Sequence, residues 1–353
     1  MYLHMEDAMD FNIDVNYVID TAVELISIPS PVGYTYDAIT RVGQELCALG
    51  ITNYKITKKG AIIGFIEGEN NNYKKMISAH VDTLGAMVKK IKFNGRLQLV
   101  NLGGVNWGSV EGENVTIHTL NGDDIEGTII PVKSSVHIYG DEARDMARNA
   151  STMEVRLDED VKTKENTENL GIRVGDFVSF DPRTVITESG YIKSRFIDDK
   201  MCVAQLLGYI KYLKDNNMKP KNGLYIYISN YEEIGHGISI VPDDLDEFIA
   251  LDIGLVGEDA LGDEKKVSIA AKDNKTPYDI TVRMGLVEAA EMNDVKYTID
   301  VYNRYGSDSS ATLLQAFDFK SACIGPSVES SHHYERTHID GVIETIKLLI
   351  AYL

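Results

Sequence analysis

Apolar side chains recur at helical spacing in some parts of the chain and in short runs in others. Helical spacing predicts helices over residues 14–28 and 36–49. Short apolar runs bounded by polar turns predict strands over 61–68 and 75–82. This alternation of helices and strands is typical of the opening of an α/β domain.

The pattern changes over residues 88–184. Short apolar runs follow one another there, separated at close intervals by Gly, Asn and Asp. Short strands with frequent turn signals predict a small all-β domain, a barrel or a sandwich. One helix is expected to interrupt it near 141–149.

The α/β pattern returns after residue 184. It predicts strands over 223–230, 248–254 and 279–284, and helices over 200–214 and 340–352. Strands alternating with helices predict a mixed, largely parallel sheet that helices cover on both faces.

The predicted fold class is therefore α/β, with a doubly covered sheet and an inserted barrel-like domain. Residues 1–87 and 185–353 would form one discontinuous catalytic domain, and 88–184 the insert.

The composition and net charge of the chain exclude some classes of binding partner. The formal net charge is -19 at pH 7, which argues against nucleic acid or an anionic membrane as the main partner. No apolar run approaches the roughly 18 residues of a membrane span, and the first residues lack the basic and apolar regions of a signal peptide. Three cysteines without CxxC spacing do not suggest a disulfide framework. We expect a soluble, cytoplasmic protein.

Polar residues with catalytic potential stand at the ends of the predicted strands, where ligands bind in open α/β sheets. His80 and Asp82 end the strand over 75–82, and residues two apart on a strand share a face. A histidine that binds a metal usually needs a partner that fixes its tautomer, and Asp82 can serve. The alternative is an exposed histidine and aspartate at a strand end.

Acidic residues follow the later strands and open a helix. Asp198 and Asp199 could cap the helix or place a carboxylate between two metal ions. Glu232 and Glu233 close an apolar strand and suit one ligand and one general base, unless they form a solvated turn. Asp252 lies in an apolar run, either as a ligand or as a buried carboxylate bonded to main-chain amides.

A histidine-rich segment, SHHYERTH, occupies residues 331–338 and holds three of the eight histidines in the chain. Not all three can be ligands. Histidines together with carboxylates make a mixed nitrogen and oxygen ligand set, which suits zinc, cobalt or manganese. Two such ions about 3.5–4 Å apart can hold and activate a bridging water.

The chain resembles the tetrahedral aminopeptidases, a glutamyl-aminopeptidase-like family of dinuclear metallopeptidases. The resemblance runs in order over nearly the whole chain, through the segments SAHVDTLGAMVKKI, NGDDIEGTIIPVKSSVH, LGIRVGDFVSFD, FIDDKMC, NYEEIGHG, ALDIG, YGSDSSA and SHHYERTHIDGVIETIKLL. It implies an aminopeptidase that acts on short peptides and uses two divalent metal ions, zinc or cobalt, with manganese as a further option.

The resemblance also implies the ligands. His80 and Asp252 would hold one ion. Glu233 and a histidine of the tail segment would hold the other, with His332 as our choice and His333 as the runner-up.

Three further roles follow from the same resemblance. Asp198 would bridge both ions, Glu232 would be the general base that deprotonates the metal-bridging water, and Asp82 would orient His80. The insert would help to build dimers, and dimers would assemble into a hollow tetrahedral dodecamer.

The sequence departs from the usual family pattern at Thr83, where an acidic residue is common, at Lys200, where Arg is common, and in the tail. These departures leave the substrate open. The alternatives are a metal-dependent amidase or deacylase of modified amino acids or small dipeptides, and a non-catalytic assembly protein of the same fold. No substrate-binding residue can be assigned from the sequence.

Overall fold

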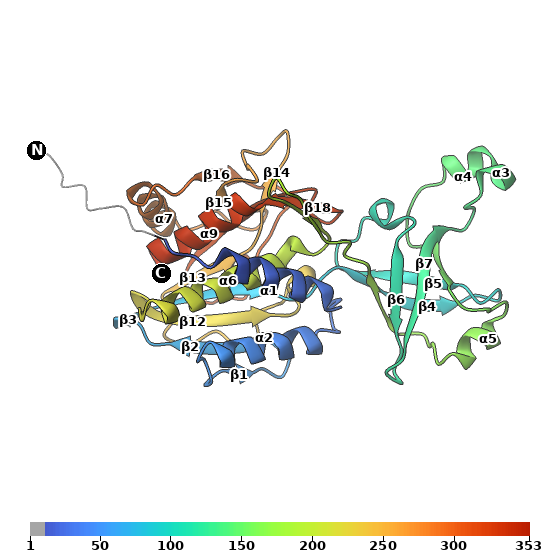
Figure 1. Ribbon diagram of the computed structural model, residues 1–353, viewed down its shortest axis with the longest axis horizontal. Helices are drawn as coiled ribbons and strands as arrows, with labels where there is room; N and C mark the ends of the chain where they lie inside the picture. Colours follow the sequence, from blue (N-terminus) through green and yellow to red (C-terminus); the bar gives the residue numbers. More distant parts are fainter. Residues whose placement is uncertain (1–10) are drawn as a thin grey trace, which may run out of the picture.

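A computed structural model describes residues 11–353, which form an α/β part and a small barrel joined by a narrow waist (Figure 1). Residues 1–10, which make up most of the segment that was expected to lack a signal peptide, lie outside the described residues. In the part of the chain that is described, no helix combines the length and the hydropathy needed to span a membrane.

Twelve strands make up the sheet of the α/β part. They are β1 (Lys55–Ile56), β2 (Ile62–Ile66), β3 (Asn70–His80), β10 (Val185–Ile186), β11 (Tyr191–Ser194), β12 (Asn222–Ser229), β13 (Glu247–Leu251), β14 (Gly254–Val256), β15 (Val267–Lys272), β16 (Tyr297–Val301), β17 (Lys320–Glu329) and β18 (Glu335–His338). The main order is β1-β2-β12-β3-β13-β17-β18-β11-β10, with β14 and β15 paired to β17 and β16 paired to β15. The central strands β12, β3, β13 and β17 are parallel, whereas the margins of this path are antiparallel. The predicted mixed sheet is confirmed.

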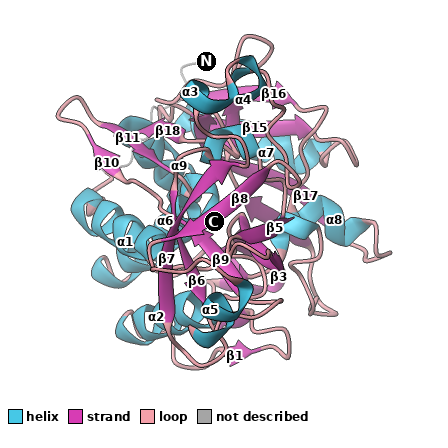
Figure 2. Ribbon diagram, turned by 90° about the vertical axis from the view of Figure 1, so that its right-hand side faces the viewer, coloured by secondary structure: helices cyan, strands magenta, loops and turns pink. Residues whose placement is uncertain are grey.

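Helices cover both faces of this sheet. The longer ones are α1 (Val15–Ser27), α2 (Tyr36–Ala48), α6 (Ile197–Asp215), α7 (Ile280–Met292) and α9 (Ile339–Tyr352), and α8 (Asp308–Leu313) is a short one. Helices α1, α6 and α9 pack together, and α8 lies on the other side of the sheet (Figure 2). Strand β13 shows why both faces need cover: Ile249 and Leu251 enter the main core, and Phe248 and Ala250 enter clusters on the opposite face.

The strand predicted over 279–284 is wrong, because these residues begin α7. The side chain of Asp279 accepts hydrogen bonds from the main-chain N–H groups of Thr281 and Val282, which starts a helix. Val282, Leu286 and Ala290 then follow at intervals of four and are buried, so the short apolar alternation was the start of a helical stripe.

A closed barrel of six strands forms the insert. These are β4 (Gly85–Ile91), β5 (Leu97–Leu102), β6 (Asn114–His118), β7 (Asp124–Pro131), β8 (Met153–Leu157) and β9 (Phe177–Phe180), in the order β4-β5-β8-β7-β6-β9. Alternate residues such as Val115, Ile117 and Val178 fill a core separate from the main one. The predicted barrel-like domain is confirmed, and its first strand starts at Gly85; the domain boundaries themselves stay a prediction.

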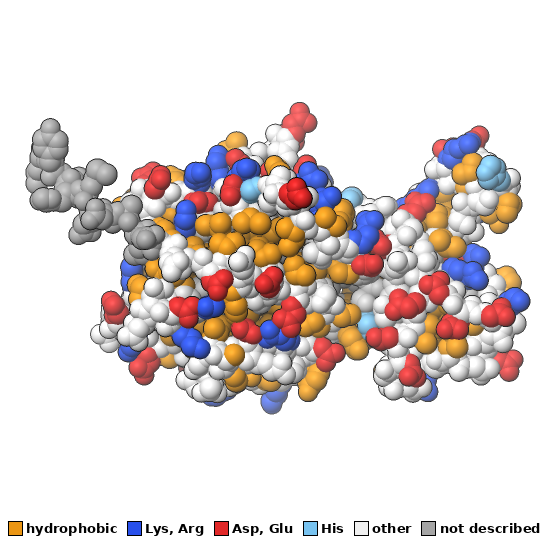
Figure 3. All heavy atoms as spheres, viewed as in Figure 1, with side chains coloured by type: hydrophobic (Ala, Val, Ile, Leu, Met, Phe, Trp, Pro, Cys, Tyr) orange, Lys and Arg blue, Asp and Glu red, His pale blue; other side chains and the backbone are white. Residues whose placement is uncertain are grey.

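Short helical turns occupy several connections: η1 (Trp107–Val110), α3 (Val136–Tyr139), α4 (Asp141–Arg144), α5 (Lys164–Asn169) and η2 (Glu232–Ile234). The helix expected over 141–149 is wrong in length, because α4 stops at Arg144. Acidic and basic side chains are interspersed over the face shown in Figure 3, so the negative net charge does not gather in one patch there.

Candidate metal centre

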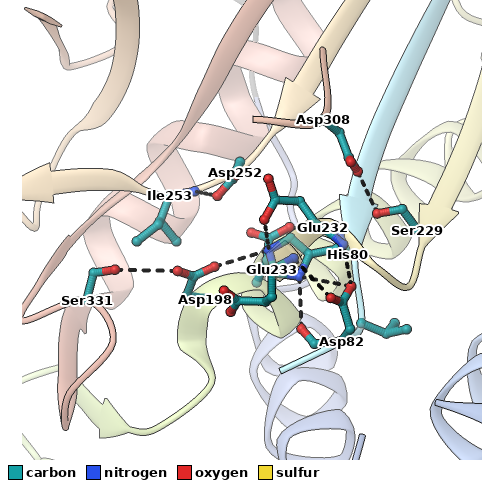
Figure 4. A network of polar contacts seen from close by, with 12 residues as sticks. His80, Asp82, Asp198, Ser229, Glu232, Glu233, Asp252, Ile253, Asp308 and Ser331 are labelled. Atoms are coloured by element: carbon teal, nitrogen blue, oxygen red, sulfur yellow. Dashed lines mark hydrogen bonds and ion pairs between the residues drawn. The ribbon is translucent and has the colours of Figure 1, made fainter. Parts of the chain in front are cut away.

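Three neighbouring strands end at one edge of the sheet. His80 is the last residue of β3, Asp252 directly follows β13, and Glu232 and Glu233 follow β12 in the turn η2. Because β12, β3 and β13 are adjacent and parallel, their carboxyl ends meet at the same edge. The order of the strands therefore brings these four side chains together (Figure 4).

Asp198 reaches the same place from the start of α6. Phe196, directly before the helix, has φ 68°. Asp198 and Asp199 have non-helical backbone angles with a cis peptide bond between them. The N-cap position makes no side-chain hydrogen bond, so the alternative of an Asp cap is not realised. Instead, Asp198 Oδ1 lies 3.2 Å from His80 Nε2.

A first group of possible ligands consists of His80, Asp198, Asp199 and Asp252, whose ligand atoms lie within 4.8 Å of one another. His80 Nδ1 lies 2.9 Å from the carbonyl oxygen of Asp82 and donates a hydrogen bond to it, while Nε2 faces Asp198. A neutral imidazole has one N–H, so the lone pair of Nε2 is free to bind a cation.

Asp82 contributes through two different groups. Its carbonyl oxygen orients His80, whereas the nearer carboxylate oxygen is 3.6 Å from His80 Nδ1. The carboxylate accepts hydrogen bonds from the main-chain N–H groups of Glu232 and Glu233, each at 3.1 Å. Asp82 thus fixes the histidine and the acidic turn at once.

A second group consists of Asp198, Glu233 and His332. His332 Nε2 lies 3.5 Å from Glu233 Oε2 and 3.7 Å from Asp198 Oδ2. His333, the runner-up from the sequence, belongs to neither group and lines a small cavity nearby. Asp198 is common to both groups.

The buried carboxylates of this site have few positive partners, which favours a bound cation. Among the ion pairs of residues 11–353, its carboxylates pair only with His80 and His332. Burial, followed by the neighbouring Asp198 carboxylate, raises the pKa of Asp252 to about 7 and the pKa of Glu233 well above its usual value. Buried carboxylates without positive partners are costly, so the donor set fits divalent metal ions.

Glu232 stands apart from both ligand groups. Its Oε2 lies 3.9 Å from His80 Nε2, and its side chain keeps 13% exposure. Burial raises the pKa of Glu232 well above its usual value, with nearby carboxylates adding to the effect of burial. It lines a cavity of about 580 Å³ that also takes in Asp198, Glu233, Asp252 and His332.

The same cavity has a cationic side that the sequence did not reveal. Lys275 follows β15, Arg304 follows β16, and both line the cavity. Neither takes part in an ion pair within residues 11–353. Nothing in the local sequence marks them, because the order of the strands alone brings these two loops to the candidate metal centre.

Glu335 was part of the tail segment but had no assigned role. Its Oε2 accepts the main-chain N–H of Asp198 at 3.1 Å, and its Oε1 accepts that of His332 at 3.2 Å. Asp199, a member of the first group of possible ligands, accepts the main-chain N–H of His80 at 3.0 Å. Both buried carboxylates hold the backbone of the candidate ligands.

Known proteins resemble this chain in sequence. A family model described as M42 glutamyl aminopeptidase matches residues 60–348. The Bacillus subtilis aminopeptidase candidate YhfE is 43% identical over 331 residues, which cover 94% of this chain and 95% of that protein. The lysyl aminopeptidase of Pyrococcus furiosus is 25% identical over 60% of this chain and 58% of its own length.

Solved structures agree in fold. A TET aminopeptidase from a marine Thaumarchaeota archaeon has a TM-score of 0.86 at 18% identity, covering 95% of this chain and 96% of that one. The Pyrococcus horikoshii TET1 peptidase, which can assemble into a tetrahedron or a large octahedral shell, has a TM-score of 0.80 at 22% identity, covering 95% and 98%. The molecule is thus a metal-dependent peptidase. The chain belongs to the M42 family of aminopeptidases.

Proposed function

We propose that this aminopeptidase uses two divalent metal ions to remove N-terminal residues from short peptides. The observation that carries the proposal is the sharing of Asp198 by both ligand groups. One ion would be held by His80, Asp252 and Asp198, and the other by Glu233, His332 and Asp198. Nitrogen and oxygen ligands without thiolate suit zinc or cobalt, and manganese as a further choice.

The residues of the site would have separate roles in hydrolysis. When bound, the two ions would polarise the scissile carbonyl and acidify a water. Glu232 accepts the proton of the attacking water and returns it to the leaving amine. Asp82 holds the main chain of Glu232 in place, which keeps this carboxylate at the cavity next to the ligand groups.

Metal removal tests this proposal. Elemental analysis of the purified protein is expected to give about two ions per chain, in line with dinuclear hydrolases. Chelation should abolish hydrolysis of aminoacyl-p-nitroanilides, and zinc, cobalt or manganese should restore it. Acetylated substrates serve as the comparison. Turnover of acetylated substrates alone would favour the amidase alternative. A protein that binds no metal and has no activity after reconstitution would favour the non-catalytic alternative.

We propose further that the enzyme prefers an acidic N-terminal residue. Lys275 and Arg304 supply the cationic side of the cavity, and the description of the family model names glutamyl substrates. Hydrogen bonds to charged groups contribute about 1.5–3 kcal/mol, enough for a preference of roughly tenfold or more.

Substrates that differ only in charge test this preference. We expect glutamyl-p-nitroanilide to be cleaved with a higher kcat/KM than glutaminyl-p-nitroanilide. Lys275→Met and Arg304→Met should each lower that ratio about tenfold. Neither substrate has a free terminal carboxylate, so the ratio reports the side chain alone. Lys265→Met, an exposed lysine paired with Asp340, is the matched control. A ratio that stays the same in both cavity variants would refute the assignment.

The chain is also proposed to self-associate through the insert into dimers and then a dodecamer. The barrel part exposes large apolar side chains, among them Phe93 at 89%, Leu120 at 75% and Val174 at 65%. Exposed apolar side chains are available for an interface, although only a contiguous patch of them marks one. The assembly of the Pyrococcus horikoshii peptidase supports the proposal.

A further inference from the structure

The inserted barrel reaches the candidate metal centre through the turn that follows β5. The carbonyl oxygen of Gly104, in this turn, lies 3.2 Å from Nδ1 of His332. The neighbouring Gly103 has φ 73° and passes close to Glu233, whose Cβ lies 3.4 Å from the place of a Cβ on Gly103. Two residues of the second ligand group therefore contact the insert.

The contact with Gly104 decides which nitrogen of His332 can bind a metal. A carbonyl oxygen only accepts, so Nδ1 must carry the hydrogen. Nε2 then keeps its lone pair, and Nε2 is the atom that faces Glu233 and Asp198. Partners of this kind fix the ring orientation and tautomer of metal-binding histidines.

His332 has little else that holds its ring. Its backbone has φ 63°, a conformation that residues with a Cβ adopt at a cost. Glu335 fixes the main-chain N–H, but that bond leaves the side chain free to rotate. Its side chain is 38% exposed, and within residues 11–353 the carbonyl of Gly104 is the hydrogen-bond acceptor of its ring.

Only glycine allows the insert to come this close. A Cβ on Gly104 would lie 2.8 Å from Nδ1 of His332, closer than real Cβ contacts, and 3.0 Å from Cε1, which is tighter than most. The backbone of Gly104 itself has no positive φ, so a side chain there strains the histidine rather than the turn.

We infer that Gly104 is a positioning residue for the second metal ion, and that docking of the barrel on the α/β part is a condition for holding that ion. The inference rests on the proposed dinuclear function. It gives the insert a role in the metal centre in addition to assembly.

Gly104→Ala tests the inference through metal content. The added methyl group would push the His332 ring away from the Gly104 carbonyl oxygen. Loss of a partner that orients a ligand typically weakens metal binding about 10–100-fold. We expect this variant to retain one ion per chain after gel filtration where the unmodified protein retains two. Gly257→Ala is the matched control, because a Cβ at Gly257 meets no atom within 4 Å, and it should retain both ions.

His332→Ala separates the inference from the proposed function. If His332→Ala loses one ion and Gly104→Ala binds both with unchanged affinity, the ligand set stands and the role of Gly104 is wrong. If His332→Ala keeps both ions, the proposed ligand set fails and the inference fails with it. A crystal structure of Gly104→Ala gives a reading independent of metal content: a ring turned away from Glu233 supports the inference, and a ring in its present orientation overturns it.

Discussion

Glu232→Gln is expected to lower kcat by about 10³-fold and to leave both metal ions in place, because a general base contributes roughly 10²–10⁴-fold. Glu232 lies beside the two ligand groups without belonging to either. Its main-chain N–H is fixed by Asp82, so the change should leave the turn intact. Glutamine has the same shape as glutamate but cannot accept the proton of the attacking water.

Three measurements on this variant isolate the chemical step. Turnover of glutamyl-p-nitroanilide gives kcat, elemental analysis gives the ion count, and thermal unfolding gives stability. The exposed Glu188→Gln is the control for removal of one charge and should match the unmodified enzyme in all three. A kcat of Glu232→Gln within about tenfold of normal would exclude Glu232 as the base, since that is below the usual contribution of such a group.

Asp198→Asn is the second change with a large expected effect, namely the loss of both ions and of activity. Oδ1 of Asp198 lies 3.2 Å from His80 Nε2, and Oδ2 lies 3.7 Å from His332 Nε2. An amide offers only one oxygen, so at least one ion loses a ligand and the other loses a negative charge. Because even orienting partners are worth about 10–100-fold in metal affinity, we expect a loss of more than about 100-fold at both sites.

Metal titration followed by thermal unfolding measures this effect. A ligand that binds only the folded state raises the melting temperature, so zinc added after chelation should stabilise the metal-free unmodified protein and leave metal-free Asp198→Asn nearly unchanged. Asp215→Asn, at the far end of the same helix, is the matched control and should respond as the unmodified protein does. Two tightly bound ions in Asp198→Asn would show that this carboxylate does not bridge them.

The acidic turn shows how far the sequence leads toward the site. Glu232 and Glu233 were recognisable because they end an apolar strand, and the parallel neighbours β3 and β13 end in His80 and Asp252 by the same logic. The local sequence could not decide which of the two glutamates is the ligand and which is the general base. Only the turn η2, with both N–H groups bound by Asp82, places Glu233 beside Asp198 and His332 and leaves Glu232 outside the groups.

The two adjacent histidines of the tail pose the same problem. His332 and His333 are alike in sequence, and the resemblance alone favoured the former. The positive φ of His332, the hold of Glu335 on its main chain and the contact with Gly104 turn its ring toward Asp198. Gly104 and Asp198 are distant from the tail in sequence, so no local pattern predicts which of the two histidines is the ligand.

The sequence by itself determined the α/β sheet and the inserted barrel, because hydrophobic periodicity is a local property. It also predicted the candidate ligands, from their places at strand ends and from the family resemblance, and these stay a prediction. It misassigned residues 279–284, where six residues are too few to separate a strand from the first turns of a helix. Only the tertiary structure brought Lys275, Arg304 and Gly104 to the candidate metal centre. Their positions follow from strand order and from the docking of the barrel, which are long-range contacts that local sequence does not encode.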